Sequence, residues 1–349
     1  MERNLEKWVH YDTKFNPERV DECNTIHIFH HYDNDGIVAA GVVVKRYLYF
    51  DNFKFYSIKY ENVFDTTDIK PNDIVFIVDF NIGEKQLESL YEIIDIVGID
   101  KVVWIDHHKS TIEEEHPELK DIFGYRYIGY SGAMLTYFYL IKISLSEYQK
   151  ICIELGKDFD DIPKNLDELF VLYYSKCSKF LKLIDDYDCW KKLNNGDQDI
   201  FKLGFEAKYK NITKYSDWLN FICDEIEIEQ YVWEPFYRSI YKHGKVIQTV
   251  NTEKYKNAVN NLSFEYDIKG YKALVLNFSE RNSIVFGDKI NDYDICCVYN
   301  YNGKVYTYSL YTAKPDIDVS IIAKSLDSNG GGHKGAAGFI KDYNIFSKK

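Results

Sequence analysis

The sequence lacks paired cysteines and long apolar runs. Its 349 residues include seven cysteines, an odd number, and none of them forms a CxxC pair. This usage is typical of reduced, mostly buried thiols in a cytoplasmic protein. No apolar stretch approaches the ~18 residues of a membrane helix, and the first residues carry no apolar leader segment. We therefore expect a cytoplasmic protein that does not contact a membrane.

The chain also has no excess of basic residues. Its 43 Lys and Arg stand against 55 Asp and Glu, which gives a formal net charge of −12. Proteins that grip long nucleic acid by its phosphates usually carry a basic surface, so a long duplex is not the expected partner. A small anionic substrate remains compatible with this charge, because bound metal ions can reverse the local field.

What the sequence does contain is an alternation of strand-like and helix-like patterns. Strands that are apolar throughout and alternate with helices are typical of a parallel sheet covered on both faces. The patterns predict strands at residues 25–29, 53–59, 73–79 and 101–105, and helices at residues 36–49 and 82–97, the second ending at Gly98.

The remainder of the chain reads first as helical and then as short strands. A chain of 349 residues is too long for one ordinary core. We expect an α/β protein with an N-terminal parallel-sheet domain (1–200), a helical connector (201–261) and a smaller C-terminal α+β domain (262–349). Within these parts, the patterns predict helices at 131–156, 165–188, 197 to about 245 and 319–326, and strands at 272–277, 295–301 and 304–311, with a hairpin turn at Asn302-Gly303.

Three side chains that can bind metal follow the first predicted strand: His31, Asp33 and Asp35. At this spacing in extended backbone they point the same way, and Gly36 then lets the chain turn into the helix. An imidazole with two carboxylates suits Mn²⁺ or a similar cation, since Ca²⁺ and Mg²⁺ prefer oxygen ligands. An Asx-turn in which Asp33 or Asp35 caps the helix is the alternative, and it stays open.

Two more strands end in residues of the same kind. Asp79 ends the strand at 73–79, where a plain turn residue is the alternative, and Asp106-His107-His108 follows the strand at 101–105. One residue suffices to cap a strand end, whereas here there are three. Sites in open α/β sheets usually lie at the carboxyl ends of the strands. If the strands are neighbours, these residues form one polynuclear metal site, and a hydrolytic enzyme is the leading interpretation.

A glycine-rich run, Gly330 to Gly338, lies near the end of the chain. Successive glycines let backbone N–H groups approach an anion closely. We expect a substrate clamp made of Gly331, Gly332, His333 and Lys334, and a flexible glycine-rich hairpin is the alternative.

These motifs together resemble the DHH phosphoesterase superfamily, and most closely its nanoRNase/oligoribonuclease branch. The resemblance covers roughly residues 25 to 340, and its C-terminal part is similar to the associated DHHA1 domain. The matching segments are His31-x-Asp33-x-Asp35-Gly36, Asp79, Asp106-His107-His108, Ser131-Gly132-Ala133, Tyr187-Asp188-Cys189-Trp190 and Gly330-Gly331-Gly332-His333-x-x-Ala336-Ala337-Gly338.

The resemblance implies two divalent metal ions, usually Mn²⁺. It implies catalytic roles for Asp106, which would support its neighbours, and for His108, which would face the substrate phosphate. Asp185 and Asp186 are alternatives to Asp188 as the aspartate of the fourth motif. The implied ligands are His31 and Asp33 for the first ion, Asp35, His107 and Asp188 for the second, and Asp79 for both.

One segment departs from the family pattern. Many relatives carry Ser-Leu-Arg in the strand before the last helix, where this chain has Ser309-Leu310-Tyr311. Tyr311 could stack on a base in place of the missing arginine, and Arg281 could supply the charge.

The resemblance implies hydrolysis of phosphodiester bonds in short oligonucleotides or dinucleotides by water that two metal ions activate. Two alternatives stay open. One is a phosphoesterase for cyclic dinucleotides or for 3′-phosphoadenosine 5′-phosphate, and the other is an inactive relative that only binds nucleotides. The oligomeric state also stays open, with a homodimer as one option.

Overall fold

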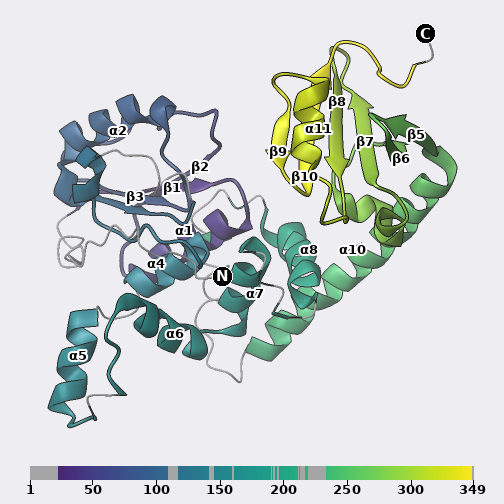
Figure 1. Cartoon of the computed structure of the whole chain (residues 1–349). Coiled ribbons are helices and arrows are strands. Elements are labelled where there is room, and N and C mark those ends of the chain that lie inside the picture. Colours follow the sequence, from purple (N-terminus) through teal and green to yellow (C-terminus); the bar gives the residue numbers. More distant parts are fainter. Residues whose placement is uncertain are drawn as a thin grey trace. The chain divides into compact units, whose positions relative to one another are not determined.

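The structure is a computed structural model in which the chain divides into two compact units, Met1–Lys245 and Val246–Lys349 (Figure 1). Trp190 of the predicted fourth motif lies outside the described residues. The boundaries predicted at residues 200 and 261 stay predictions. The structure describes residues 23–108, 117–140, 145–158, 161–189, 191, 193–194, 196–210, 212, 217–218 and 233–347.

A four-stranded parallel sheet forms the centre of the first unit, with the strand order β2-β1-β3-β4. This arrangement confirms the predicted α/β class. The elements of the unit are β1 (Ile26–His31), α1 (Asn34–Arg46), β2 (Phe53–Ile58), β3 (Ile74–Val78), α2 (Glu84–Val97), β4 (Val102–Ile105), α4 (Gly132–Leu140), α5 (Leu145–Glu154), α6 (Leu166–Lys176), α7 (Lys179–Asp188) and α8 (Asp197–Tyr209), with short 3₁₀ helices at Ile99–Lys101 and Pro117–Asp121.

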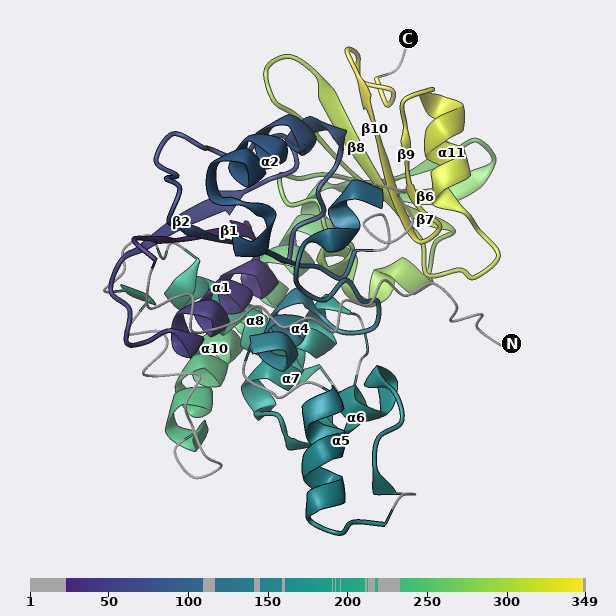
Figure 2. The ribbon, with the colours of Figure 1, turned by 90° about the vertical axis from the view of Figure 1, so that its left-hand side faces the viewer.

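Both faces of this sheet are covered, as continuous apolar strands require. On β3, Phe76 and Val78 join a core that includes residues of α1, α4 and α7, whereas Val75 and Ile77 join a second core with residues of α2. Figure 2 shows α2 on one side of the strands and α1 and α4 on the other. Gly98 ends α2 with a φ of 87°, as predicted.

The two helices predicted at 131–156 and 165–188 are each broken into shorter ones. The first divides into α4 and α5, and residues 141–144 between them are outside the described residues. The second breaks because Cys177 is extended and the hydroxyl of Ser178 accepts a hydrogen bond from the backbone N–H of Leu181, which starts α7. Serine at this position is a helix start signal within an otherwise helical pattern.

A six-stranded mixed sheet forms the centre of the second unit, in the order β5-β6-β7-β8-β10-β9. Only β6 and β7 pair in parallel within it. The helix α10 (Trp233–Leu262) contains residues of both units. The other elements are β5 (Ser263–Ile268), β6 (Tyr271–Asn277), β7 (Ile295–Tyr301), β8 (Tyr306–Tyr311), α11 (Val319–Leu326), β9 (Gly331–His333) and β10 (Ala336–Lys341), with a 3₁₀ segment at Ser283–Asn291.

The glycine-rich run forms a β-hairpin. Its strands β9 and β10 pair antiparallel, with His333 opposite Ala336. Gly332 has a φ of 142° and lies so close to Ala336 that a Cβ on it would meet the Ala336 carbonyl oxygen at 2.6 Å. The strands β5, β9 and β10 were absent from the sequence prediction. Across the described segments, no helix is both long and apolar enough to cross a membrane.

Candidate metal centre

The polar strand ends that the sequence singled out meet at one edge of the first sheet. His31 is the last residue of β1, Asp79 follows β3, and Asp106 follows β4. Because β3 pairs with both β1 and β4, the three strand ends are neighbours. The expected convergence at the carboxyl edge is therefore what the fold produces.

The His107 imidazole lies among three carboxylates. Its Nε2 is 3.2 Å from Oδ1 of Asp79, 3.3 Å from Oδ2 of Asp188 and 3.8 Å from Oδ2 of Asp35. These aspartates come from three elements that are far apart in the chain. One histidine thus faces several acidic groups, an arrangement that a bound cation would stabilise.

Asp79 occupies the centre of this group in an unusual state. Its backbone has a φ of 54°, which non-glycine residues rarely adopt. The side chain is buried, and neither carboxylate oxygen accepts a hydrogen bond from the described residues. Burial, together with the charges of Asp35, Asp33 and Asp188, raises the pKa of Asp79 well above its usual range. Two buried oxygens without hydrogen bonds fit the role of metal ligands.

Gly132, at the start of α4, makes room for Asp79. A Cβ at Gly132 would lie 2.5 Å from the Asp79 Cβ and 2.7 Å from its Oδ1. The small-residue helix start in the sequence is thus explained by close approach to the metal centre and not by positive φ.

His31 and Asp33 form a second pair beside Asp79. His31 Nδ1 lies 2.7 Å from Asp33 Oδ2. Asp33 also caps α1, because its Oδ1 accepts a hydrogen bond of 2.9 Å from the Gly36 backbone N–H. Burial would raise the pKa of Asp33, but the His31 and Gly36 contacts outweigh it and lower that pKa. Asp33 can therefore cap the helix through Oδ1 and remain available to a metal ion through Oδ2, so the two interpretations are compatible.

Asp35 corrects one step of the sequence prediction. It lies in the first turn of α1, so the extended alternation from His31 stops at Asp33. Its two oxygens accept hydrogen bonds from the backbone N–H groups of Gly132 (2.6 Å) and Ala133 (3.0 Å). Asp35 thereby binds the N-terminus of α4, where a carboxylate is favoured by the helix dipole. It still faces His107, but through an oxygen that already accepts a hydrogen bond.

Among the aspartates at the end of α7, Asp188 is the one that faces His107. Asp185 accepts hydrogen bonds from the Ser131 backbone N–H (2.8 Å) and from Lys191 Nζ (2.5 Å). Asp186 accepts them from the backbone N–H groups of Leu193 and Asn194, and so closes the turn after the helix. Geometry therefore supports Asp188 as the aspartate of the fourth motif.

His108 makes contacts on two sides. Its Nδ1 lies 2.7 Å from Oδ1 of Asp106, which is fully buried, and its Nε2 lies 2.9 Å from the Tyr60 hydroxyl. Burial lowers the pKa of His108, but the Asp106 hydrogen bond and the nearby carboxylates outweigh it and raise that pKa to about 9. Tyr60 was not predicted from the sequence, because it follows β2 and only the fold brings it to His108.

Three overlapping groups of side chains place donor atoms close enough to share an ion. Burial, followed by the negative charges of Asp35 and Asp33, raises the pKa of Asp188 to about 8. This donor set of imidazole and carboxylate fits divalent transition metals. The groups are Asp79 with His107 and His108, His107 with Asp188 and Cys189, and His31 with Asp33 and Asp79.

The predicted substrate-binding residues all belong to the second unit. Tyr311, at the end of β8, pairs with Ala336, which in turn lies opposite His333. The glycine hairpin from Gly331 to Lys334 is exposed. Burial raises the pKa of the Tyr311 hydroxyl, and the positive charge of Arg281 acts against that rise.

Residues 25–169 match the family model described as the DHH family, N-terminal domain. This match lies within the first unit. No curated protein matches the sequence. Members of the DHH family are metal-dependent phosphoesterases, and the predicted enzyme class is confirmed at this level. The family also uses divalent metals, in agreement with the ligand groups around His107.

Solved structures align with most of the chain. The DHH domain of a protein assigned to a ribosomal protein family is 17% identical with a TM-score of 0.53, over 93% of this chain and 83% of that one. The exonuclease RecJ bound to manganese is 15% identical with a TM-score of 0.43, over 95% and 92%. A pGpG-specific phosphodiesterase from Vibrio cholerae is 11% identical with a TM-score of 0.44, over 91% and 94%. The likeness to the first of these structures, at 17% identity, supports the fold alone.

Proposed function

We propose that this DHH protein is a phosphodiesterase that hydrolyses short oligonucleotides or dinucleotides with the help of two divalent ions, preferably Mn²⁺. The observation that carries the proposal is the buried Asp79 carboxylate, whose oxygens accept no hydrogen bond from the described residues, beside the His107 imidazole at 3.2 Å. A plain turn residue would leave this burial and this clustering of acids without a physical cause.

The proposed ligand sets follow the positions of the side chains. Asp79 lies between the His31–Asp33 pair and the His107–Asp188 pair, which suits a ligand shared by two ions. Ions at these positions would make a bound water acidic enough to supply hydroxide near neutral pH and would neutralise charge on phosphoryl oxygens. The proposed ligands are His31 and Asp33 for the first ion, Asp35, His107 and Asp188 for the second, and Asp79 for both.

In this proposal, His108 would contact the substrate and Asp106 would hold His108 in position. Asp106 fixes the ring of His108 through Nδ1, which leaves Nε2 as the atom that can contact a phosphoryl oxygen. In the structure, Nε2 of His108 lies 2.9 Å from the Tyr60 hydroxyl. A substrate oxygen that contacts Nε2 would therefore also lie within reach of this hydroxyl.

Short substrates are favoured by charge. A net charge of −12 opposes binding to a long polyanion, whereas one or two phosphates can be compensated by two metal ions. The exposed hairpin residues Gly331, Gly332, His333 and Lys334, together with Tyr311, are the proposed contacts to a base or a second phosphate. A stacked tyrosine would tolerate any base.

The experiment is hydrolysis of a substrate panel by the full chain with Mn²⁺, Mg²⁺ or a chelator. The panel contains dinucleotides, oligonucleotides of up to five residues, a long single strand, cyclic di-AMP and 3′-phosphoadenosine 5′-phosphate. We expect the short linear substrates to be cleaved fastest, with Mn²⁺, and activity to vanish with the chelator.

The other outcomes separate the alternatives. Preference for cyclic di-AMP or for the bisphosphate would replace the proposed substrate, and preference for the long strand would refute the short-substrate proposal. Saturable binding of dinucleotides without any cleavage would identify a nucleotide-binding relative. Full activity in the chelated protein would refute the metal centre itself.

A further inference from the structure

A pocket of about 190 Å³ opens beside the metal centre, within the first unit. It is formed by the start of α1 and by α7 and α8, and three of its residues, Asp33, Asp35 and Asp188, belong to the metal centre. The remaining lining residues have no part in the proposed chemistry. They are Asn34, Leu183, Ile184, Tyr187, Gln198, Phe201, Lys202 and Glu206.

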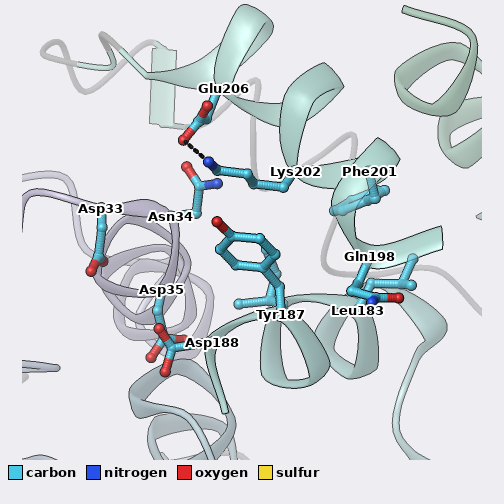
Figure 3. Close-up of a pocket in the computed structure, with 11 residues that line it drawn as sticks. Asp33, Asn34, Asp35, Leu183, Tyr187, Asp188, Gln198, Phe201, Lys202 and Glu206 are labelled. Carbon is cyan, nitrogen blue, oxygen red and sulfur yellow. Dashed lines mark ion pairs between the residues drawn. The ribbon is translucent and has the colours of Figure 1, made fainter. Parts of the chain in front are cut away.

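The wall away from the metal centre carries one ion pair. Lys202 Nζ lies 3.4 Å from Oε1 of Glu206, and the same ammonium lies 5.0 Å from the centre of the Tyr187 ring. Figure 3 shows this pair at one end of the pocket and Asp33, Asp35 and Asp188 at the other. Lys202 and Glu206 keep 25% and 30% of their side-chain surface exposed, so both can contact a molecule in the pocket.

The charges of the lining restrict what can enter. With metal ions on Asp33, Asp35 and Asp188, the remaining charged groups are Lys202 and Glu206, whose sum is zero. A second phosphate at this end would gain no net charge compensation, because the Lys202 ammonium is already paired with the Glu206 carboxylate. A neutral group with hydrogen-bond donors would instead use the carboxylate as an acceptor.

The other lining groups suit the same kind of molecule. The Asn34 side chain offers both donors and an acceptor, and the residue is buried at the start of α1. Tyr187 is the half-buried aromatic ring of the lining and gives the pocket apolar surface for a ring, whereas Leu183 and Phe201 are buried. A neutral ring system with a polar edge matches both halves of this lining.

We propose that this pocket is a nucleoside subsite, which holds the base or sugar of a nucleotide whose phosphate lies at the metal centre. Glu206 accepts hydrogen bonds from the nucleoside, and Lys202 and Asn34 pair with its remaining polar atoms. The inference rests on the proposed function, because it requires a nucleotide phosphate at the metals. It places the contacts to the base or sugar on helices α7 and α8 of the first unit.

The test is a binding measurement that does not depend on turnover. Isothermal titration calorimetry of the Mn²⁺-loaded chain gives Kd for adenosine 5′-monophosphate and for inorganic phosphate, and their ratio isolates the nucleoside contribution. Loss of one hydrogen bond to a charged group weakens binding about tenfold. We therefore expect Lys202→Met to reduce the ratio about tenfold, and Glu206→Gln, which keeps an acceptor oxygen but loses its charge, to reduce it about fivefold.

The matched control is Lys289→Met. Lys289 also belongs to a short-range ion pair, with Asp292 at 3.5 Å, but it lies in the second unit and is more than half exposed. We expect the control to keep the wild-type ratio. Circular dichroism melts establish that all three variants are folded.

The outcomes distinguish the subsite from the proposed function. A ratio that stays within twofold of wild type in both Glu206→Gln and Lys202→Met overturns the subsite, even if diesters are cleaved. A collapsed ratio in a protein that cleaves no diester supports the subsite and refutes the proposed function.

Discussion

His27 and Asp73 lie at the amino edge of the parallel sheet, whereas His107 and Asp79 lie at its carboxyl edge. At the amino edge, His27 Nε2 is 2.9 Å from Asp73 Oδ2, and its Nδ1 is 3.0 Å from the Tyr56 hydroxyl. Each edge places a histidine beside an aspartate from a neighbouring part of the sheet, and His27, Asp73 and Asp79 are buried while His107 is partly exposed. The residue types alone therefore do not identify a site.

The difference lies in how the charges are matched. One carboxylate meets one imidazole at the amino edge, and Asp73 Oδ2 also accepts a hydrogen bond from the Lys70 backbone N–H. At the carboxyl edge several carboxylates surround His107, and both Asp79 oxygens lack hydrogen bonds from the described residues. A buried pair whose charges match supports the fold, whereas an excess of buried carboxylate calls for a cation.

The largest effect is expected from a substitution at the carboxyl edge. Asp79→Asn should lower kcat/KM on a dinucleotide by at least about 10³-fold, because a shared metal ligand is lost. In the metal-free protein the same change should not lower the melting temperature, since the pKa of Asp79 is raised and its carboxyl oxygens accept no hydrogen bond from the described residues. Activity assays and calorimetry check both halves. A melting temperature that falls together with activity would make Asp79 a structural residue.

A second substitution moves Asp79 without replacing it. Gly132→Ala would place a Cβ 2.5 Å from the Asp79 Cβ, and we expect kcat to fall about 10²-fold as the carboxylate shifts. Gly83→Ala is the matched control, because Gly83 also stands at a helix start but its nearest heavy atom is 3.6 Å away. Equal activity in the two variants would show that the close approach to Asp79 has no catalytic role.

The third prediction concerns a substitution at the amino edge. His27→Ala removes a fully buried ring and leaves Asp73 without its partner, which should lower the free energy of unfolding by about 2–4 kcal/mol. The kcat of the protein that stays folded should equal that of wild type, because the pair lies at the opposite edge from the metal centre. Chemical denaturation and turnover at a temperature well below the melting transition measure the two quantities separately. A large loss of kcat in folded protein would contradict the division of roles between the edges.

Much of the carboxyl edge could be predicted from the sequence, because it depends on local patterns, whereas the His27–Asp73 pair was not predicted. Continuous apolar strands before Asp79 and Asp106 predicted buried parallel strands, and polar residues directly after them predicted a shared edge. The capping role of Asp33 was an open alternative. Local patterns carry no information on contacts such as Asp35 with Gly132, 97 residues apart, or Tyr60 with His108, 48 residues apart. Those contacts depend on how α4 and the segment after β2 pack, which periodicity does not encode.

The smallest expected effect is a pH dependence of opposite sign at the two edges. Burial lowers the pKa of His27 below its usual 6.5, although Asp73 opposes the shift, so the unfolded chain takes up a proton before the native one does. The stability that His27 contributes is therefore present above pH 6.5 and is lost as the pH falls below it. Asp79, whose native pKa is raised, keeps its proton when the unfolded chain has lost it, so its contribution is lost as the pH rises above 3.8. Unfolding of the metal-free protein between about pH 5 and 8 should show a flatter acid limb in His27→Gln and a flatter alkaline limb in Asp79→Asn. Parallel curves for both variants would mean that neither edge contributes to the pH dependence of stability.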